Sequence, residues 1–255
     1  MNMKNIFYAL IIIFVFGYFS CADQKVLKKQ GEARRGVGEA YMFQSDYSMA
    51  LKELLNAEKI YPNDPVLHND LGLVYMAKDR LQTAVEHFKK AIELKHDYAP
   101  AINNLGTAYL ALKDWDLAID NFNKVSNDLL YATPHYSLTN LGWAYYNKKD
   151  FTLAEKYYKE ALEIESNYPI ALHGLGITYL KLNNPTEAVI YLERAIKYSP
   201  WIPDYYMNLS EAYIKLNQYE KAIISYYKVI EISPESDISA KAQKEIARLK
   251  TQNYK

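Results

Sequence analysis

The chain has 255 residues, enough for one large domain or two small ones. Half of its residues are hydrophobic and 24% are charged, a balance that excludes disorder over the whole chain. Lysine plus arginine number 30 and aspartate plus glutamate also number 30, so the net charge of zero disfavours a nucleic-acid partner. The single cysteine excludes an internal disulfide framework, and the low glycine and proline content disfavours a turn-rich β fold.

The first thirty residues predict a targeting segment followed by a tether. Residues 6–19 are uncharged and mostly apolar, shorter than the roughly 20 residues that a membrane-spanning helix needs, and they fit a secretory signal better. Ser20 and Cys21 follow, and a small residue before the only cysteine resembles a bacterial lipoprotein signal. This resemblance implies that residues 1–20 are removed, that Cys21 is lipidated and that residues 21–30 form a polar tether. An uncleaved N-terminal anchor is the alternative.

Residues 31–236 repeat one pattern six times. A tyrosine follows each small residue of the pattern by three positions, and an alanine follows each tyrosine by nine. The small residues are separated by 34, 34, 36, 34 and 34 positions, and they are Gly38, Gly72, Gly106, Gly142, Gly176 and Ser210. A period of 34 residues resembles the tetratricopeptide repeat. The resemblance implies an all-α fold, a right-handed superhelical solenoid of six helix pairs.

The spacing has a physical basis in helix packing. Small side chains allow the two helices of a pair to cross closely, and each pair leaves apolar surface that the next pair covers. The array therefore needs an end cap. Ile238, Ala242, Ile246 and Leu249 lie on one face of a helix that we predict within residues 237–255. This C-terminal segment is predicted to be a capping helix with a short tail.

The one spacing of 36 places two extra residues between the third and fourth repeats, within residues 126–134. Leu129, Leu130 and Tyr131 are apolar residues in this connection. They either plug the gap that the insertion opens or form an exposed ledge for a partner. Both interpretations stay open.

Catalytic and metal-binding motifs are missing from the sequence. No histidine pair has the spacing with glutamate of a helical zinc protease, and His87 and His96 are nine residues apart on one predicted helix. Gly174 and Gly176 lack the third glycine of a dinucleotide-binding loop and fall inside a predicted helix, so we assign them to the repeat scaffold. We predict a non-catalytic protein with no cofactor, no metal and no small-molecule substrate.

In a fold of this kind the first helix of each pair lines a groove. The position two before each small residue is occupied by Gly36, Asp70, Asn104, Asn140, Gly174 and Asn208. Asn104 and Asn140, together with Asn103, can pair with the backbone of an extended peptide, although some of these amides could instead bridge helices. Trp143 and Tyr146 lie within one helical turn and are aromatic anchor candidates. These five residues are the predicted partner-binding groove.

Three short motifs surround the junction of the third and fourth repeats: the Asn-Asn pair at 103–104, the Ser-x-Asp-x-Leu-Tyr run at 126–131 and the Asn-Leu-Gly sequence at 140–142. In these motifs the junction is similar to that of the type IV pilus biogenesis lipoproteins, the PilF/PilW pilotin family. The resemblance implies a lipid-anchored envelope protein of the outer membrane, facing the periplasm, that helps the pilus secretin to localise or assemble. The alternative function is a periplasmic repeat adaptor that scaffolds cell-wall or proteolytic enzymes.

Overall fold

The computed structural model describes the backbone of residues 3–126 and 133–252, and the side chains of residues 23–125 and 133–251. Over this part of the chain the protein forms thirteen α-helices and no strand, which confirms the predicted all-α fold. Two compact units are present, Met1–Leu112 and Lys113–Lys255. The N-terminal unit contains α1 (Met3–Phe43), α2 (Tyr47–Ile60), α3 (Pro65–Ala77), α4 (Leu81–Leu94) and α5 (Ala99–Leu112). The C-terminal unit contains α6 (Trp115–Ser126), α7 (Pro134–Asn147), α8 (Phe151–Ile164), α9 (Pro169–Lys181), α10 (Pro185–Tyr198), α11 (Pro203–Lys215), α12 (Tyr219–Ile232) and α13 (Asp237–Gln252).

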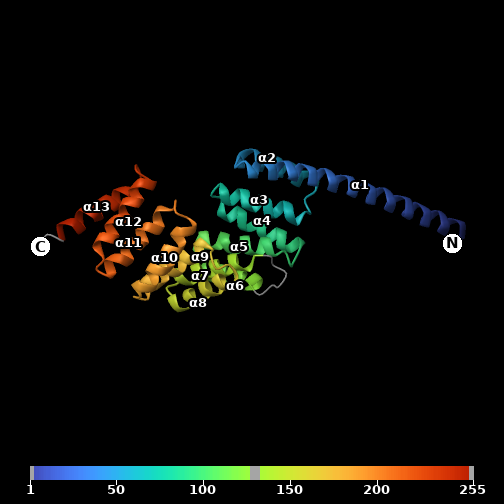
Figure 1. The fold of residues 1–255 in the computed structure, drawn as a ribbon. Helices are drawn as coiled ribbons and strands as arrows, with labels where there is room; N and C mark the ends of the chain where they lie inside the picture. Colours follow the sequence, from blue (N-terminus) through green and yellow to red (C-terminus); the bar gives the residue numbers. More distant parts are fainter. Residues whose placement is uncertain (1–2, 127–132, 253–255) are drawn as a thin grey trace. The chain divides into compact units, whose positions relative to one another are not determined.

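The helices pair as the period predicts. The end of α1 and α2 form the first repeat, and α3 with α4 form the second. In the sequence the third repeat covers α5 and α6, and these two helices belong to different units, so each is described within its own unit. The fourth, fifth and sixth repeats are α7 with α8, α9 with α10, and α11 with α12. Within each unit the helices follow one another as antiparallel neighbours in chain order (Figure 1).

A recurring turn ends the first helix of each pair. The turn residue has a positive φ, between 57° and 65°, at Ser45, Asp79, Lys113, Lys149, Asn183 and Asn217. In the fourth repeat the N–H of Asp150 donates to the carbonyl of Tyr145, the repeated tyrosine, over 3.0 Å, which closes a Schellman turn. The side chain of Asp150 then accepts the N–H of Leu153 and caps α8. The helix–turn–helix unit is thus encoded locally by the sequence.

The small residues mark the points where paired helices cross. A Cβ atom added at Gly142 would lie 2.8 Å from the ring of Tyr158, and one at Gly72 would lie 2.4 Å from Phe88. Both rings are fully buried, so they have little room to move aside. Ser210 fills the same position in the sixth repeat and donates its hydroxyl to a backbone carbonyl of α12 over 3.2 Å. The predicted role of the small positions is confirmed in these pairs.

The two ends of the repeat array differ in form. Helix α1 runs without a break from Met3 through residues 21–30 into the first repeat, so the segment predicted as a tether is helical. In the part of the chain that the structure describes, no helix combines the length and apolar character needed to cross a membrane. At the other end α13 packs on α12 and buries Ala242, Ile246 and Leu249, which confirms the predicted capping helix.

Candidate partner-binding site

The C-terminal unit contains a pocket between the fourth and fifth repeats. Its volume is about 300 Å³. The lining residues are Thr139, Asn140 and Trp143 from α7, Tyr158 from α8, and Ile170, His173 and Gly174 from α9. The structure therefore brings Asn140 and Trp143 of the predicted groove together in one pocket. Ile170 and His173 from α9 were not among the residues predicted for the groove.

The indole of Trp143 is the main exposed aromatic surface of this pocket, with 42% of the residue accessible. The ring of Tyr146 stacks against it at 5.5 Å between centroids and 7° between planes, and Phe151 meets Tyr146 edge-on at 5.5 Å. Ile170, 54% exposed, adds an aliphatic side chain from α9. Because the indole is held by a parallel neighbour, it is a preorganised anchor for an apolar group.

Tyr146 and His173 keep this region uncharged near neutral pH. Burial, followed by the nearby Glu211 carboxylate, raises the pKa of Tyr146. Burial lowers the pKa of His173 to about 4, with Asp204 opposing that change. The side-chain amide of Asn208 donates to Nε2 of His173 over 2.8 Å, which requires an unprotonated nitrogen. The pocket is therefore suited to a neutral or apolar group.

Gly174 sets how closely α9 approaches α8. A Cβ atom at this position would lie 2.3 Å from the buried ring of Tyr158. Burial raises the pKa of the Tyr158 hydroxyl, so this phenol remains neutral beneath the pocket. The scaffold role assigned to Gly174 from the sequence thus has a packing basis, since any side chain here would collide with the pocket floor.

The amide column of the groove makes bonds between successive repeats. In the N-terminal unit Asn104 on α5 donates its amide to Oδ1 of Asn69 on α3 over 2.9 Å. In the C-terminal unit the bond from Asn208 on α11 to His173 on α9 repeats this arrangement, and each pair is separated by 35 residues. The sequence left two roles open for these amides, pairing with a peptide backbone and bridging helices. Asn104 and Asn208 bridge the first helices of successive repeats. Each amide has further donor and acceptor capacity that a ligand can use.

The predicted site residues fall in different parts of the chain. Asn103 and Asn104 are neighbours on α5 of the N-terminal unit, whereas Asn140, Trp143 and Tyr146 lie on α7 of the C-terminal unit. The three apolar residues of the insertion, Leu129, Leu130 and Tyr131, lie outside the described residues. Cys21 lies in α1, and its side chain is outside the described part of the chain.

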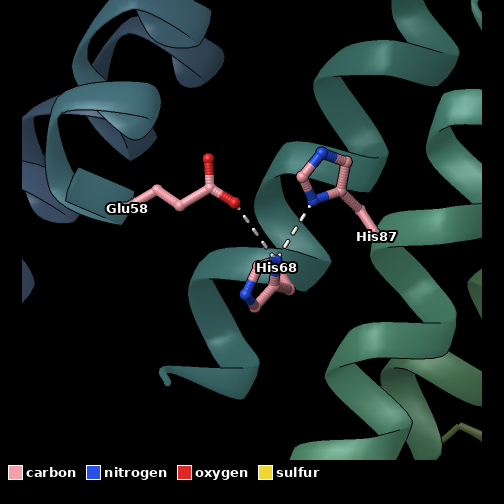
Figure 2. A group of neighbouring side chains, drawn as sticks. All are labelled: Glu58, His68 and His87. Atoms are coloured by element: carbon pink, nitrogen blue, oxygen red, sulfur yellow. Dashed lines mark hydrogen bonds and ion pairs between the residues drawn. The ribbon is translucent and has the colours of Figure 1, made fainter. Parts of the chain in front are cut away.

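One cluster in the N-terminal unit was missed by the sequence analysis, which predicted no metal. Glu58, His68 and His87 come from α2, α3 and α4, and their ligand atoms lie within 4.8 Å of one another (Figure 2). The residues are 10 and 19 positions apart, on three separate helices, so no motif spacing identifies them. Only the stacking of the first two repeats brings them together.

Paired helices with a regular period, glycine crossings and a pocket between first helices define a helical repeat scaffold. The chain belongs to the tetratricopeptide repeat family, whose models match residues 64–130, 97–167, 137–200 and 203–236. Proteins of this family bind peptides or protein partners, as the sequence resemblance implied.

Several solved structures share the fold. PilW, described as a widely conserved type IV pilus biogenesis factor, superimposes with a TM-score of 0.78 at 21% identity, over 84% of this chain and 98% of PilW. The pilF protein of Pseudomonas aeruginosa gives 0.74 at 19% identity, over 86% and 99% of the two chains. YrrB, described as a tetratricopeptide protein with an unusual peptide-binding site, gives 0.55 at 21% identity, over 75% and 97%. No curated protein sequence matches the chain.

Proposed function

We propose that the chain is a non-catalytic, lipid-anchored protein of the bacterial envelope that supports type IV pilus biogenesis. In this proposal it assists the localisation or assembly of the pilus secretin in the outer membrane and faces the periplasm. The proposal is supported by the fold shared with PilW and pilF over nearly their full lengths. It is also supported by the Asn-Asn and Asn-Leu-Gly sequences that flank the junction of repeats three and four.

The pocket between α7 and α9 is the proposed partner site, and the exposed Trp143 is the observation that carries it. An extended or short helical segment of the partner inserts an apolar side chain between Trp143 and Ile170. The side-chain amide of Asn140, on the wall of the same pocket, can donate to and accept from the partner's backbone. Aromatic residues in such pockets supply much of the binding free energy of protein interfaces.

The proposed anchor is the lipidated Cys21. A single acyl chain holds a protein only weakly at a membrane, so stable attachment needs the several chains that a bacterial lipoprotein carries. Removal of residues 1–20 would leave Cys21 on the helix that continues into the first repeat. Lipid attachment would then hold the binding pocket in the compartment where the secretin assembles.

The function can be tested with Trp143→Ala in the full chain. Trp201→Ala is the matched control, because Trp201 is 65% exposed and lies outside the pocket. We expect Trp143→Ala to weaken partner binding by about 2 kcal/mol or more and to reduce secretin multimers and surface pili. Trp201→Ala should leave both at the wild-type level.

Unchanged thermal unfolding of both variants establishes that the fold survives. Normal multimers and normal pili in folded Trp143→Ala would contradict the proposed site. Intact multimers combined with altered cell-wall or proteolytic phenotypes would favour the alternative, a periplasmic adaptor that scaffolds such enzymes.

A further inference from the structure

Three side chains with metal-ligating atoms meet in the N-terminal unit. Glu58 and His87 point towards His68 from the two helices on either side of α3 in the chain (Figure 2). His68 is buried, with 5% of the residue exposed, and the other two are partly buried. The cluster therefore joins the second helix of the first repeat to both helices of the second repeat. It lies in the opposite unit from the proposed partner pocket.

The hydrogen bonds of His68 fix which of its nitrogens faces the cluster. Its Nε2 lies 2.8 Å from the carbonyl oxygen of Pro62, which can only accept, so Nε2 carries the hydrogen. The Nδ1 atom is left with a lone pair, and it faces Nδ1 of His87 at 3.1 Å and Oε1 of Glu58 at 3.8 Å. A histidine that donates one N–H to a backbone carbonyl and offers the other nitrogen is the usual arrangement of a metal ligand.

The second imidazole is also held in place. The ring of His87 stacks between Tyr75, at 5.2 Å, and His68, at 5.4 Å. Burial lowers the pKa of His87, while the carboxylates of Glu58 and Glu86 oppose this change. A neutral imidazole is the form that coordinates metals. In the metal-free chain its Nδ1–H donates to Nδ1 of His68.

We propose that Glu58, His68 and His87 bind a divalent transition-metal ion of the Zn²⁺ class through the two Nδ1 atoms and the carboxylate. In a tetrahedral site with metal–nitrogen distances of about 2.0–2.1 Å, neighbouring ligand atoms lie about 3.3 Å apart. The two Nδ1 atoms are already 3.1 Å apart, whereas Oε1 of Glu58 lies 3.8 Å from Nδ1 of His68 and would have to move closer to complete the site. On binding, the ring hydrogen of His87 moves from Nδ1 to Nε2, and the fourth position is open to water.

The ligand set also determines which ions bind. Two imidazoles with one carboxylate suit Zn²⁺, Ni²⁺ and Cu²⁺, whereas Mg²⁺ and Ca²⁺ prefer oxygen ligands. Because the three ligands belong to three helices, the ion stabilises the junction of the first two repeats. The unfolded chain has no such preformed site, so binding raises the unfolding temperature.

The test is a calorimetric titration of the full chain in detergent with Zn²⁺ and, separately, Mg²⁺, together with thermal unfolding followed by circular dichroism. We expect one Zn²⁺ per chain and a higher unfolding temperature with Zn²⁺ only. His87→Gln should weaken Zn²⁺ binding at least about 100-fold, since loss of even an outer-shell partner costs 10–100-fold. His96→Gln, which changes an exposed histidine just beyond α4, is the matched control and should bind as the wild type does.

Glu58→Gln, a nearly isosteric change at a partly exposed position, provides a second variant if His87→Gln unfolds. It should lose affinity and the Zn²⁺-induced rise in unfolding temperature in parallel. Failure of the wild-type chain to bind Zn²⁺ at one per chain would overturn the proposal. Equal Zn²⁺ affinity of the wild type and a folded ligand variant would overturn it as well. The pilus and secretin measurements do not enter this test, so the two proposals fail independently.

Discussion

Asp70, on α3, is a buried residue whose carboxyl group makes the stability of the chain depend on pH. The residue is 8% exposed and its Oδ2 atom has no hydrogen-bond partner. Burial, and then the carboxylate of Glu39, raise the pKa of Asp70 to about 7, with Arg35 opposing. The folded chain therefore holds a proton here that the unfolded chain releases at a lower pH. The contribution of Asp70 to stability is largest below about pH 4 and is lost as the pH rises towards 7.

Asp70→Asn should remove this pH dependence. At about pH 8 the free energy of unfolding of the variant should exceed that of the wild type by on the order of 2 kcal/mol. This difference should shrink towards pH 4. Urea unfolding of the wild type and the variant at several pH values measures the difference and its pH dependence. Asp97→Asn is the control, because Asp97 is exposed, and it should give a constant small difference. A stability gain for Asp70→Asn that does not grow with pH would contradict this role.

At the scale of the helix pair, two glycines on the first helices of their repeats are expected to respond in opposite ways to substitution by alanine. Gly142→Ala places a Cβ 2.8 Å from the buried ring of Tyr158, and overpacking of this kind costs about 1–3 kcal/mol. Gly36 lies inside α1, is exposed and has no atom within 4 Å of an added Cβ. Gly36→Ala should therefore stabilise the chain by up to about 1 kcal/mol through helix propensity. Urea unfolding of both variants checks the signs, and destabilisation by Gly36→Ala would be contrary to the described packing.

The turn between paired helices offers a second prediction. Lys149 has a φ of 65°, a conformation that costs a residue with a Cβ atom about 1 kcal/mol. Lys149→Gly should raise the free energy of unfolding by roughly 0.5–1 kcal/mol. Lys149→Ala is the matched control, because it removes the lysine side chain but keeps the Cβ, and it should show no gain. Equal stabilities of the two variants would argue against strain at this turn.

The helix pairs were predictable because their determinants are local and periodic. The small residues and the tyrosine three positions after each recur at fixed spacing, and a side-chain cap such as Asp150 is present in some of the repeats. The pocket was predictable in part, because Asn140 and Trp143 lie on the first helix of their repeat, at positions that line the groove in a fold of this kind. Its other wall, with Ile170 and His173, depends on the fit of one repeat against the next.

The remaining features depend on contacts that no spacing rule captures. Asn104 and Asn208 each form a hydrogen bond with a residue 35 positions earlier, one residue more than the period of 34. A comparison of each residue with the one 35 positions earlier could have found this recurrence. The Glu58, His68 and His87 cluster comes from three helices, and the described residues of the other repeats contain no counterpart. The extension of α1 through residues 21–30 was also not evident, because a polar segment carries little helical periodicity.

At the scale of the whole molecule, the proposed function requires a membrane anchor. In the native cell Cys21→Ala should abolish labelling with radioactive palmitate and move the chain out of the outer-membrane fraction, because no acyl chains attach. The fold should be unaffected, since the repeats begin downstream of this residue. Fractionation with immunoblotting measures the shift. A Cys21→Ala chain that still incorporates palmitate and still fractionates with the outer membrane would disprove lipid attachment at this residue.

The central claim is that the pocket between α7 and α9 contacts a secretin subunit. The most direct measurement is site-specific photo-cross-linking in the native cell, with a photoreactive amino acid at Ile170, which is exposed on the pocket wall. Ile224 on α12 is the control position, being 62% exposed and outside the pocket. The account predicts an adduct that contains the secretin from position 170 and none from position 224. The absence of a secretin adduct from position 170, or equal adducts from both positions, would contradict it.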